Sequence, residues 1–172
     1  ANGLDASKIE TINAASDATS LLQSGDADAY AITGYIAAYY EELGLGHVLK
    51  NEIEVEASTT FVFEVKDTVL TDDLGVAINK ALIRSYEEAV KNPDELYKDL
   101  ASETIPESAW KASYAFDSSL SFLSPEITPE IKEYYNNLNE WLVSKGIISS
   151  KIDVDNVVND SYYAKAQKEL GE

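Results

Sequence analysis

The segment DDLGVAINKALIRSYEEAVK, residues 72–91, has the pattern of a long amphipathic helix. Its apolar side chains recur at steps of three and four residues, which places them on one face of a helix. They are Leu74, Ala77, Ile78, Ala81, Leu82, Ala89 and Val90. Asn92-Pro93 follows directly, and because proline suits a first helical position, one helix ends there and another begins. The pattern of the chain is helical from this segment onward.

Further helix starts follow in the second half of the chain. The same proline signal for the end of one helix and the start of another recurs at Thr104-Ile105-Pro106 and at Thr128-Pro129. The segment after the second signal, TPEIKEYYNNLNEWLVSKG (128–146), has an apolar stripe and ends at Gly146. The stripe consists of Ile131, Tyr134, Tyr135, Leu138, Trp141 and Leu142. We expect Asp160 to cap a final helix that runs to Leu170. The second half is therefore predicted to be mainly helical.

Strand and helix patterns alternate before residue 72. Residues 8–13, 26–32 and 46–50 favour short strands. Two helices are expected between these strands. The first begins at Ser16 or Asp17 and ends at Gly25, and the second begins at Gly34 and ends at Gly44. The segment 57–65, ASTTFVFEV, is the clearest strand. We therefore expect an α/β fold: a small parallel βαβαβ sheet flanked by helices, with a helical C-terminal part.

Composition limits the classes of function. The 172 residues contain 13 Lys+Arg against 31 Asp+Glu, and a net charge of −18 disfavours nucleic acid as a partner. The chain has no cysteine and one histidine, His47, so no metal site is expected. Nucleophile, phosphate-loop and dinucleotide motifs are absent from the sequence. We expect a protein without catalytic residues or cofactor.

Several segments together resemble a known family. The residues NGLDASKIETINAASDATSLLQSGDADAYAI, 2–32, resemble the second-lobe segment of type II solute-binding proteins of the nitrate/sulfonate/taurine class, the extracytoplasmic receptors of ABC importers. TTFVFEVKDTVL, 59–70, is similar to the strand that crosses back to the first lobe, and ALIRSYEEAVKNPDELYKDLA, 81–101, to a helix pair with an Asn-Pro-Asp-Glu junction. Residues 141–170 resemble the C-terminal ending. The resemblance covers nearly the whole chain.

This resemblance implies a division of the chain and a role for it. Residues 1–57 would be the second-lobe α/β segment, and 58–172 the crossing strand with the helices that return to the first lobe. The chain would lack the N-terminal lobe and its signal segment. The parent protein would capture a small solute (a sulfonate, nitrate, taurine or a pyrimidine) outside the membrane, as a periplasmic protein or a lipoprotein, and deliver it to the importer permease. Apolar surface left by the missing lobe makes a homodimer plausible.

Candidate ligand-binding residues lie where strands are expected to meet helices. Thr33, Gly34 and Tyr35 form one junction, and Asn13 and Ser16 belong to the preceding one. Ligands of parallel sheets bind at this edge, because unpaired backbone N–H groups converge there. The resemblance adds Ser58, Thr59 and Thr60 of the crossing strand, and Tyr114 is a candidate wall on the helical side.

Two other functions remain open at this point. Pyrimidine-precursor synthases of thiamine biosynthesis resemble the same receptor class, but a histidine-rich active site would be expected of such an enzyme, and this chain has one histidine. A stand-alone protein-interaction module is the other alternative. Fold analogy alone does not decide among these functions.

Overall fold

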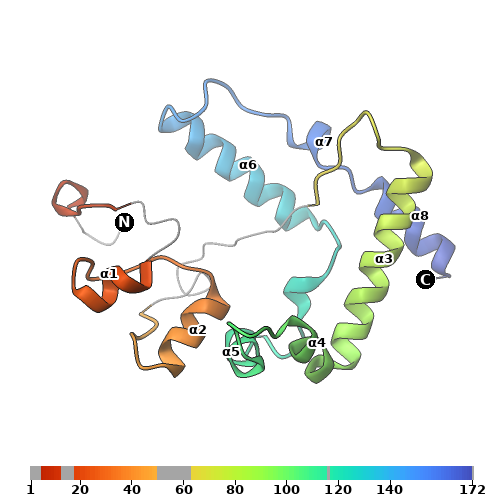
Figure 1. Cartoon of the computed structure of the whole chain (residues 1–172). Coiled ribbons are helices and arrows are strands. Elements are labelled where there is room, and N and C mark those ends of the chain that lie inside the picture. Colours follow the sequence, from red (N-terminus) through yellow and green to blue (C-terminus); the bar gives the residue numbers. More distant parts are fainter. Residues whose placement is uncertain (1–4, 13–17, 50–62, 116, 172) are drawn as a thin grey trace.

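The computed structural model describes residues 5–12, 18–49, 63–115 and 117–171. All regular elements within these ranges are helices (Figure 1). They are η1 (Ala6–Lys8), α1 (Ala18–Ser24), α2 (Gly34–Glu42), α3 (Asp72–Lys91), α4 (Pro93–Leu100), α5 (Glu107–Ser113), η2 (Ser121–Leu123), α6 (Pro129–Ser144), α7 (Val154–Val157) and α8 (Ser161–Leu170).

The helix boundaries of the second half follow local chemistry. The side chain of Thr71 accepts a hydrogen bond from the Leu74 N–H at 3.2 Å and so caps α3, and Thr128 accepts from the Ile131 N–H at 3.4 Å at the start of α6. Pro93 and Pro129 are the first residues of α4 and α6, as predicted. The helix after Asp160 is also confirmed. Asp160 is its N-cap residue, as predicted, but the carboxylate makes no capping hydrogen bond and pairs instead with Lys132 at 2.8 Å.

Helix α8 packs against the N-terminal half of the longer α3 (Figure 1). Val76, Ile83 and Ala166 are buried between them. Ion pairs from Lys165 to Asp72, at 2.8 Å, and from Lys80 to Glu169 flank this core. The predicted apolar face of α3 was partly wrong, since Leu74 and Val90 are about two-fifths exposed. The side of α3 that meets α8 carries the buried Val76 and Ile83, whereas Ala89 of the predicted face is buried near the end of the helix that meets α4.

A second group of helices consists of α2, α4 and α5. Helix α5 packs against both α2 and α4, and α4 joins this group to α3 through the Asn92-Pro93 boundary. Ala109 and Tyr97 are buried within the group, at 0% and 7% exposure. Helix α6 lies apart from this group (Figure 1), and its main contact is with α7. The buried side chain of Asn139 on α6 binds both backbone groups of Ile152.

The predicted α/β fold is wrong for the part of the chain that the structure describes. Residues 9–12, 26–32 and 46–49 are not strands, and neither are Phe63–Val65 at the end of the clearest predicted strand. Val48, Leu49 and Phe63 are exposed at 45%, 78% and 67%. A strand requires a neighbouring strand to satisfy its backbone groups and to cover its apolar face, whereas a helix satisfies its backbone internally. In the described residues the helices of the alternating pattern therefore formed and the strands of the parallel βαβαβ sheet did not, while residues 57–62 of the clearest predicted strand lie outside the described ranges.

Candidate functional site

The start of α2 is the described part of the predicted site. Thr33 precedes the helix with an extended backbone, and its side chain does not cap the helix. Gly34 is the first helical residue, and both residues are exposed. The first N–H groups of a helix have no partner inside it and carry a partial positive charge. This helix start therefore offers hydrogen-bond donors and a hydroxyl group to solvent.

Tyr35 points from α2 to α5. Its ring stacks on Trp110, with the ring centroids 4.0 Å apart and the planes 20° from parallel. The two helices approach closely here, since a Cβ added at Gly34 would lie 3.8 Å from the Ser113 Cβ. Stacked aromatic pairs contribute about 0.5–1.5 kcal/mol beyond the apolar area they bury. The pair therefore fixes the start of α2 against α5.

Tyr114 belongs to the same aromatic cluster, which we define as Tyr35, Tyr97, Trp110, Tyr114 and Phe122. Trp110 and Phe122 meet the Tyr114 ring edge to face, at 5.8 and 4.9 Å between centroids, and Tyr97 lies at 6.1 Å. Burial raises the pKa of the Tyr114 hydroxyl, and the neighbouring Tyr35 and Tyr97 raise it further. Tyr114 thus stays neutral over the physiological range and can donate a hydrogen bond.

Trp110 is a member of the cluster that the sequence reasoning missed. Its indole Nε1 is buried and has no hydrogen-bond partner among the described residues. A buried donor without an acceptor is unfavourable, so it is a place where an additional acceptor would be stabilising. The signal was present in the sequence: Trp110 and Tyr114 are four residues apart in a helical segment, a spacing that puts two side chains on one face.

Charged groups next to the cluster are paired with each other. Lys111 forms an ion pair with Asp94 at 2.8 Å and lies 6.0 Å from the centre of the Tyr97 ring. The hydrogen bond and the charge of Asp94 raise the pKa of Lys111, and Lys111 in turn lowers the pKa of Asp94. Ser108 donates to the Glu42 carboxylate and ties α5 to α2. These contacts hold the helices that carry the aromatic rings.

The structure brings together some of the predicted site residues and does not describe others. Thr33, Gly34 and Tyr35 lie at one helix start, and Tyr114 reaches them through Trp110. Asn13, Ser16, Ser58, Thr59 and Thr60 lie outside the described residues. The side chain of His47 is 89% exposed, 3.9 Å from the Glu41 carboxylate. In the described ranges, no group of three or more histidine or acidic residues could hold a metal ion.

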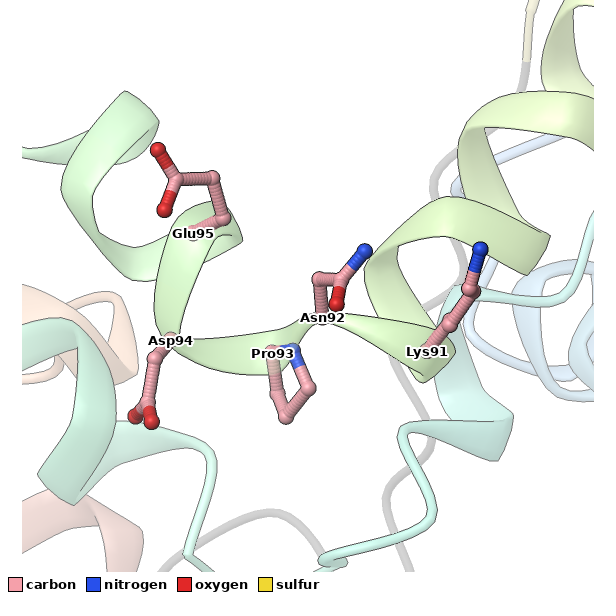
Figure 2. A pocket seen from close by; sticks show the side chains of 5 residues that line it. All are labelled: Lys91, Asn92, Pro93, Asp94 and Glu95. Carbon is pink, nitrogen blue, oxygen red and sulfur yellow. The ribbon is translucent and has the colours of Figure 1, made fainter.

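A shallow hollow of about 480 Å³ lies at the boundary between α3 and α4. It is lined by the consecutive residues Lys91, Asn92, Pro93, Asp94 and Glu95. Figure 2 shows that the side chains of Lys91, Asp94 and Glu95 point in different directions and do not converge on a common point. Binding sites require converging polar groups in an apolar hollow. The aromatic cluster beside the start of α2 is therefore the better candidate.

Comparison with protein-family models, with curated proteins and with solved structures found no match for this chain. In the described part of the chain, none of the helices is both long enough and apolar enough to cross a bilayer. A functional assignment therefore depends on the sequence resemblance and on the geometry around the aromatic cluster.

Proposed function

We propose that the chain contributes one lobe's share of the solute-binding surface in the receptor of an ABC importer. The main support is that Tyr35 and Tyr114, two candidate ligand contacts from separate segments, lie around the same tryptophan. The ordered series of segments that resemble the family is the second support. On this proposal the parent protein works outside the cytoplasmic membrane, and its partner is the importer permease.

The chemistry at the start of α2 suits a small polar or anionic solute. The N–H groups of Gly34 and Tyr35 and the Thr33 hydroxyl can donate hydrogen bonds to oxygen atoms of a sulfonate or nitrate, whereas those of Ile36 and Ala37 already donate to the Thr33 carbonyl oxygen. The helix dipole favours a negative group there, although the chain as a whole carries a charge of −18. One face of the Tyr35 ring is stacked on Trp110, so an organic part of the solute would meet the edge or the opposite face of this ring.

The same residues argue for binding rather than catalysis. Thr33, Gly34, Tyr35 and Tyr114 supply hydrogen bonds and aromatic surface, but no histidine or carboxyl group for acid–base chemistry. The pyrimidine-synthase alternative would require several histidines near the ligand, and the one histidine of the chain, His47, is a solvent-exposed residue beyond the end of α2. A protein-interaction module is the second candidate, and exposed apolar residues such as Leu49 and Phe63 favour it.

The test uses Trp110 as a fluorescent reporter. Trp141→Phe leaves Trp110 as the only tryptophan, since the chain has two. We expect taurine, methanesulfonate, nitrate or a hydroxymethylpyrimidine to change its emission, with saturation only at about millimolar concentration, because one lobe supplies only part of the contacts. Thr33→Ala added to this variant should weaken the response. Ser144→Ala, at the end of α6, is the matched control and should leave the response unchanged.

Two results would overturn different parts of the proposal. Tight 1:1 binding of a solute by the isolated chain would contradict a role as one lobe's share. The intact mass of the expressed gene product and its thermal-shift response to the same solutes test the receptor itself. A product near twice 18.9 kDa that is stabilised by one solute class supports it. A product no larger than this chain that responds to none of the solutes would favour the interaction module.

A further inference from the structure

The indole N–H of Trp110 is a polar group that the packing of α5 does not require. Its Nε1 is buried and has no hydrogen-bond partner among the described residues. A phenylalanine at this position would also stack on Tyr35 and would bury no unpaired donor. The N–H group is therefore unfavourable for the fold itself, and an unpaired buried group of this kind needs an explanation. A ligand that supplies the missing acceptor would account for it.

The surroundings of the indole favour an oxygen atom as that acceptor. Tyr35 stacks on the ring at 4.0 Å, and Tyr114 meets it edge to face at 5.8 Å. Lys111, the next residue in sequence, is paired with Asp94 at 2.8 Å. An indole N–H donates and does not accept, and a hydrogen bond among aromatic rings is stronger than the same bond in water. A solute oxygen would gain this bond, whereas an ammonium group would gain no hydrogen bond from the indole.

The segment that stacks on the indole is lightly packed. Helix α2 lies wholly within the described residues, and none of its residues is buried. Thr33 and Gly34, just before Tyr35, are exposed. At the other end of α2, the Glu42 carboxylate accepts hydrogen bonds from Ser108 of α5. The first turn of α2 can therefore move away from α5 while its far end stays attached. This movement gives a solute access to the indole beside the start of the helix.

We propose that the Nε1–H of Trp110 is a specificity-determining donor of the solute site and binds an acceptor oxygen of the solute. The inference rests on the proposed solute-binding function and adds the residue that selects the chemical group of the solute. Sulfonate and nitrate carry such an oxygen. An alkylammonium ion of similar size lacks it and should bind about tenfold more weakly, or worse, because it leaves the buried donor unpaired.

Nuclear magnetic resonance of the full 172-residue chain tests the contact directly. Trp141→Phe leaves Trp110 as the source of the one indole N–H resonance, since the chain has two tryptophans. Methanesulfonate should move this proton downfield until the site is saturated, because a charged acceptor forms a short, strong hydrogen bond. Ethylammonium should not move it downfield.

The same titration separates the inference from the function on which it rests. If the backbone N–H resonances of Gly34 and Tyr35 respond to methanesulfonate while the Trp110 indole resonance stays in place, the inference is overturned and the solute-binding function stands. If none of these resonances responds to any of the solutes, both are overturned. This experiment leaves Trp110 unchanged, so it does not depend on the fold of a variant at this position.

Removal of the donor is the second test. Trp110→Phe keeps an aromatic ring beside Tyr35 and should weaken methanesulfonate binding about tenfold, measured from the backbone resonances. The preference for methanesulfonate over ethylammonium should fall with it, whereas a purely structural role of the ring would weaken both alike. Trp141→Phe is the matched control, since Trp141 is 51% exposed on α6 and outside the aromatic cluster. A Trp110→Phe protein with the affinity and preference of the parent would overturn the inference.

Discussion

Gly75 shows how a single side-chain position fixes the packing of α3 against α8. A Cβ added there would lie 2.8 Å from ring atoms of Tyr162, closer than non-bonded atoms approach. The Tyr162 ring is held in place by Lys165, whose Nζ lies 5.4 Å from the ring centre, and by Asp72, which accepts from the tyrosine hydroxyl at 3.5 Å. The glycine therefore leaves the space that the ring occupies.

Gly75→Ala should destabilise the protein although alanine is the better helix former. Alanine normally favours a helix over glycine by about 1 kcal/mol. Here the added methyl group forces α8 to move, and overpacking of this kind costs about 1–3 kcal/mol. Urea denaturation followed by circular dichroism measures the difference. Gly34→Ala is the control, because its new Cβ would meet nothing closer than 3.8 Å, and it should not lower the stability. A Gly75→Ala protein as stable as the parent would contradict the close α3–α8 packing.

At the scale of elements, Asp117 organises the turn that leads into η2. Its carboxylate accepts hydrogen bonds from the backbone N–H groups of Ser119 and Ser121, both at 2.9 Å, and from both serine hydroxyls. These bonds hold Leu120 in the left-handed region at φ 54°, where its side chain is buried at 1% exposure. They also lower the pKa of Asp117 from 3.8 to about 2.

The lowered pKa gives the turn a defined pH dependence. Since the folded carboxyl titrates below its unfolded value, its contribution to stability is present above about pH 4 and is lost as the pH falls toward 2. Asp117→Asn should lower the melting temperature at pH 6, and the gap to the parent should narrow between pH 4 and pH 2. Differential scanning calorimetry across this range measures both proteins. A gap of constant size would show that the charge of Asp117 does not support the turn.

The elements that the sequence predicted well are those whose information is local. Thr128-Pro129 marks a helix start through a side-chain cap and a fixed φ, and Asn92-Pro93 through the fixed φ of proline alone, and both lie where the structure begins a helix. The predicted strands are absent from the described residues, because strand pairing depends on segments elsewhere in the chain. Leu49 and Phe63 have strand-like neighbours in sequence, yet the described residues provide no strand beside them.

In the candidate site, too, local features could be predicted from the sequence and contacts between distant segments could not. Gly34 could be placed at the start of a helix from its neighbours alone, and the structure agrees. The stacking of Tyr35 on Trp110 joins α2 to α5 across many residues, and no periodicity within either segment predicts it. Tyr114 was a candidate because of its aromatic ring. Its contact with Trp110, which connects it to Tyr35, could be seen only in the folded structure.

At the scale of the whole molecule, two of the helix groups in the described residues are joined by a narrow link, and α6 with α7 lies apart from them. The α3–α8 pair has its own core, and α2, α4 and α5 surround the aromatic cluster. The groups meet through the contact of α3 with α4 at the Asn92-Pro93 boundary. Cooperative unfolding requires that the loss of one part removes contacts from the other. A link of this kind predicts two separate unfolding units.

Ile83→Ala and Trp110→Ala test this division from either side. Ile83 is 4% exposed, and removing its side chain from the α3–α8 core should cost about 2–5 kcal/mol. In hydrogen exchange measured by mass spectrometry, Ile83→Ala should speed exchange in α3 and α8 and leave α2 and α5 protected. Trp110→Ala should do the reverse, because its ring holds α2 against α5. If either variant speeds exchange equally in all four helices, the chain is one cooperative unit and its two groups are coupled more tightly than their contacts indicate.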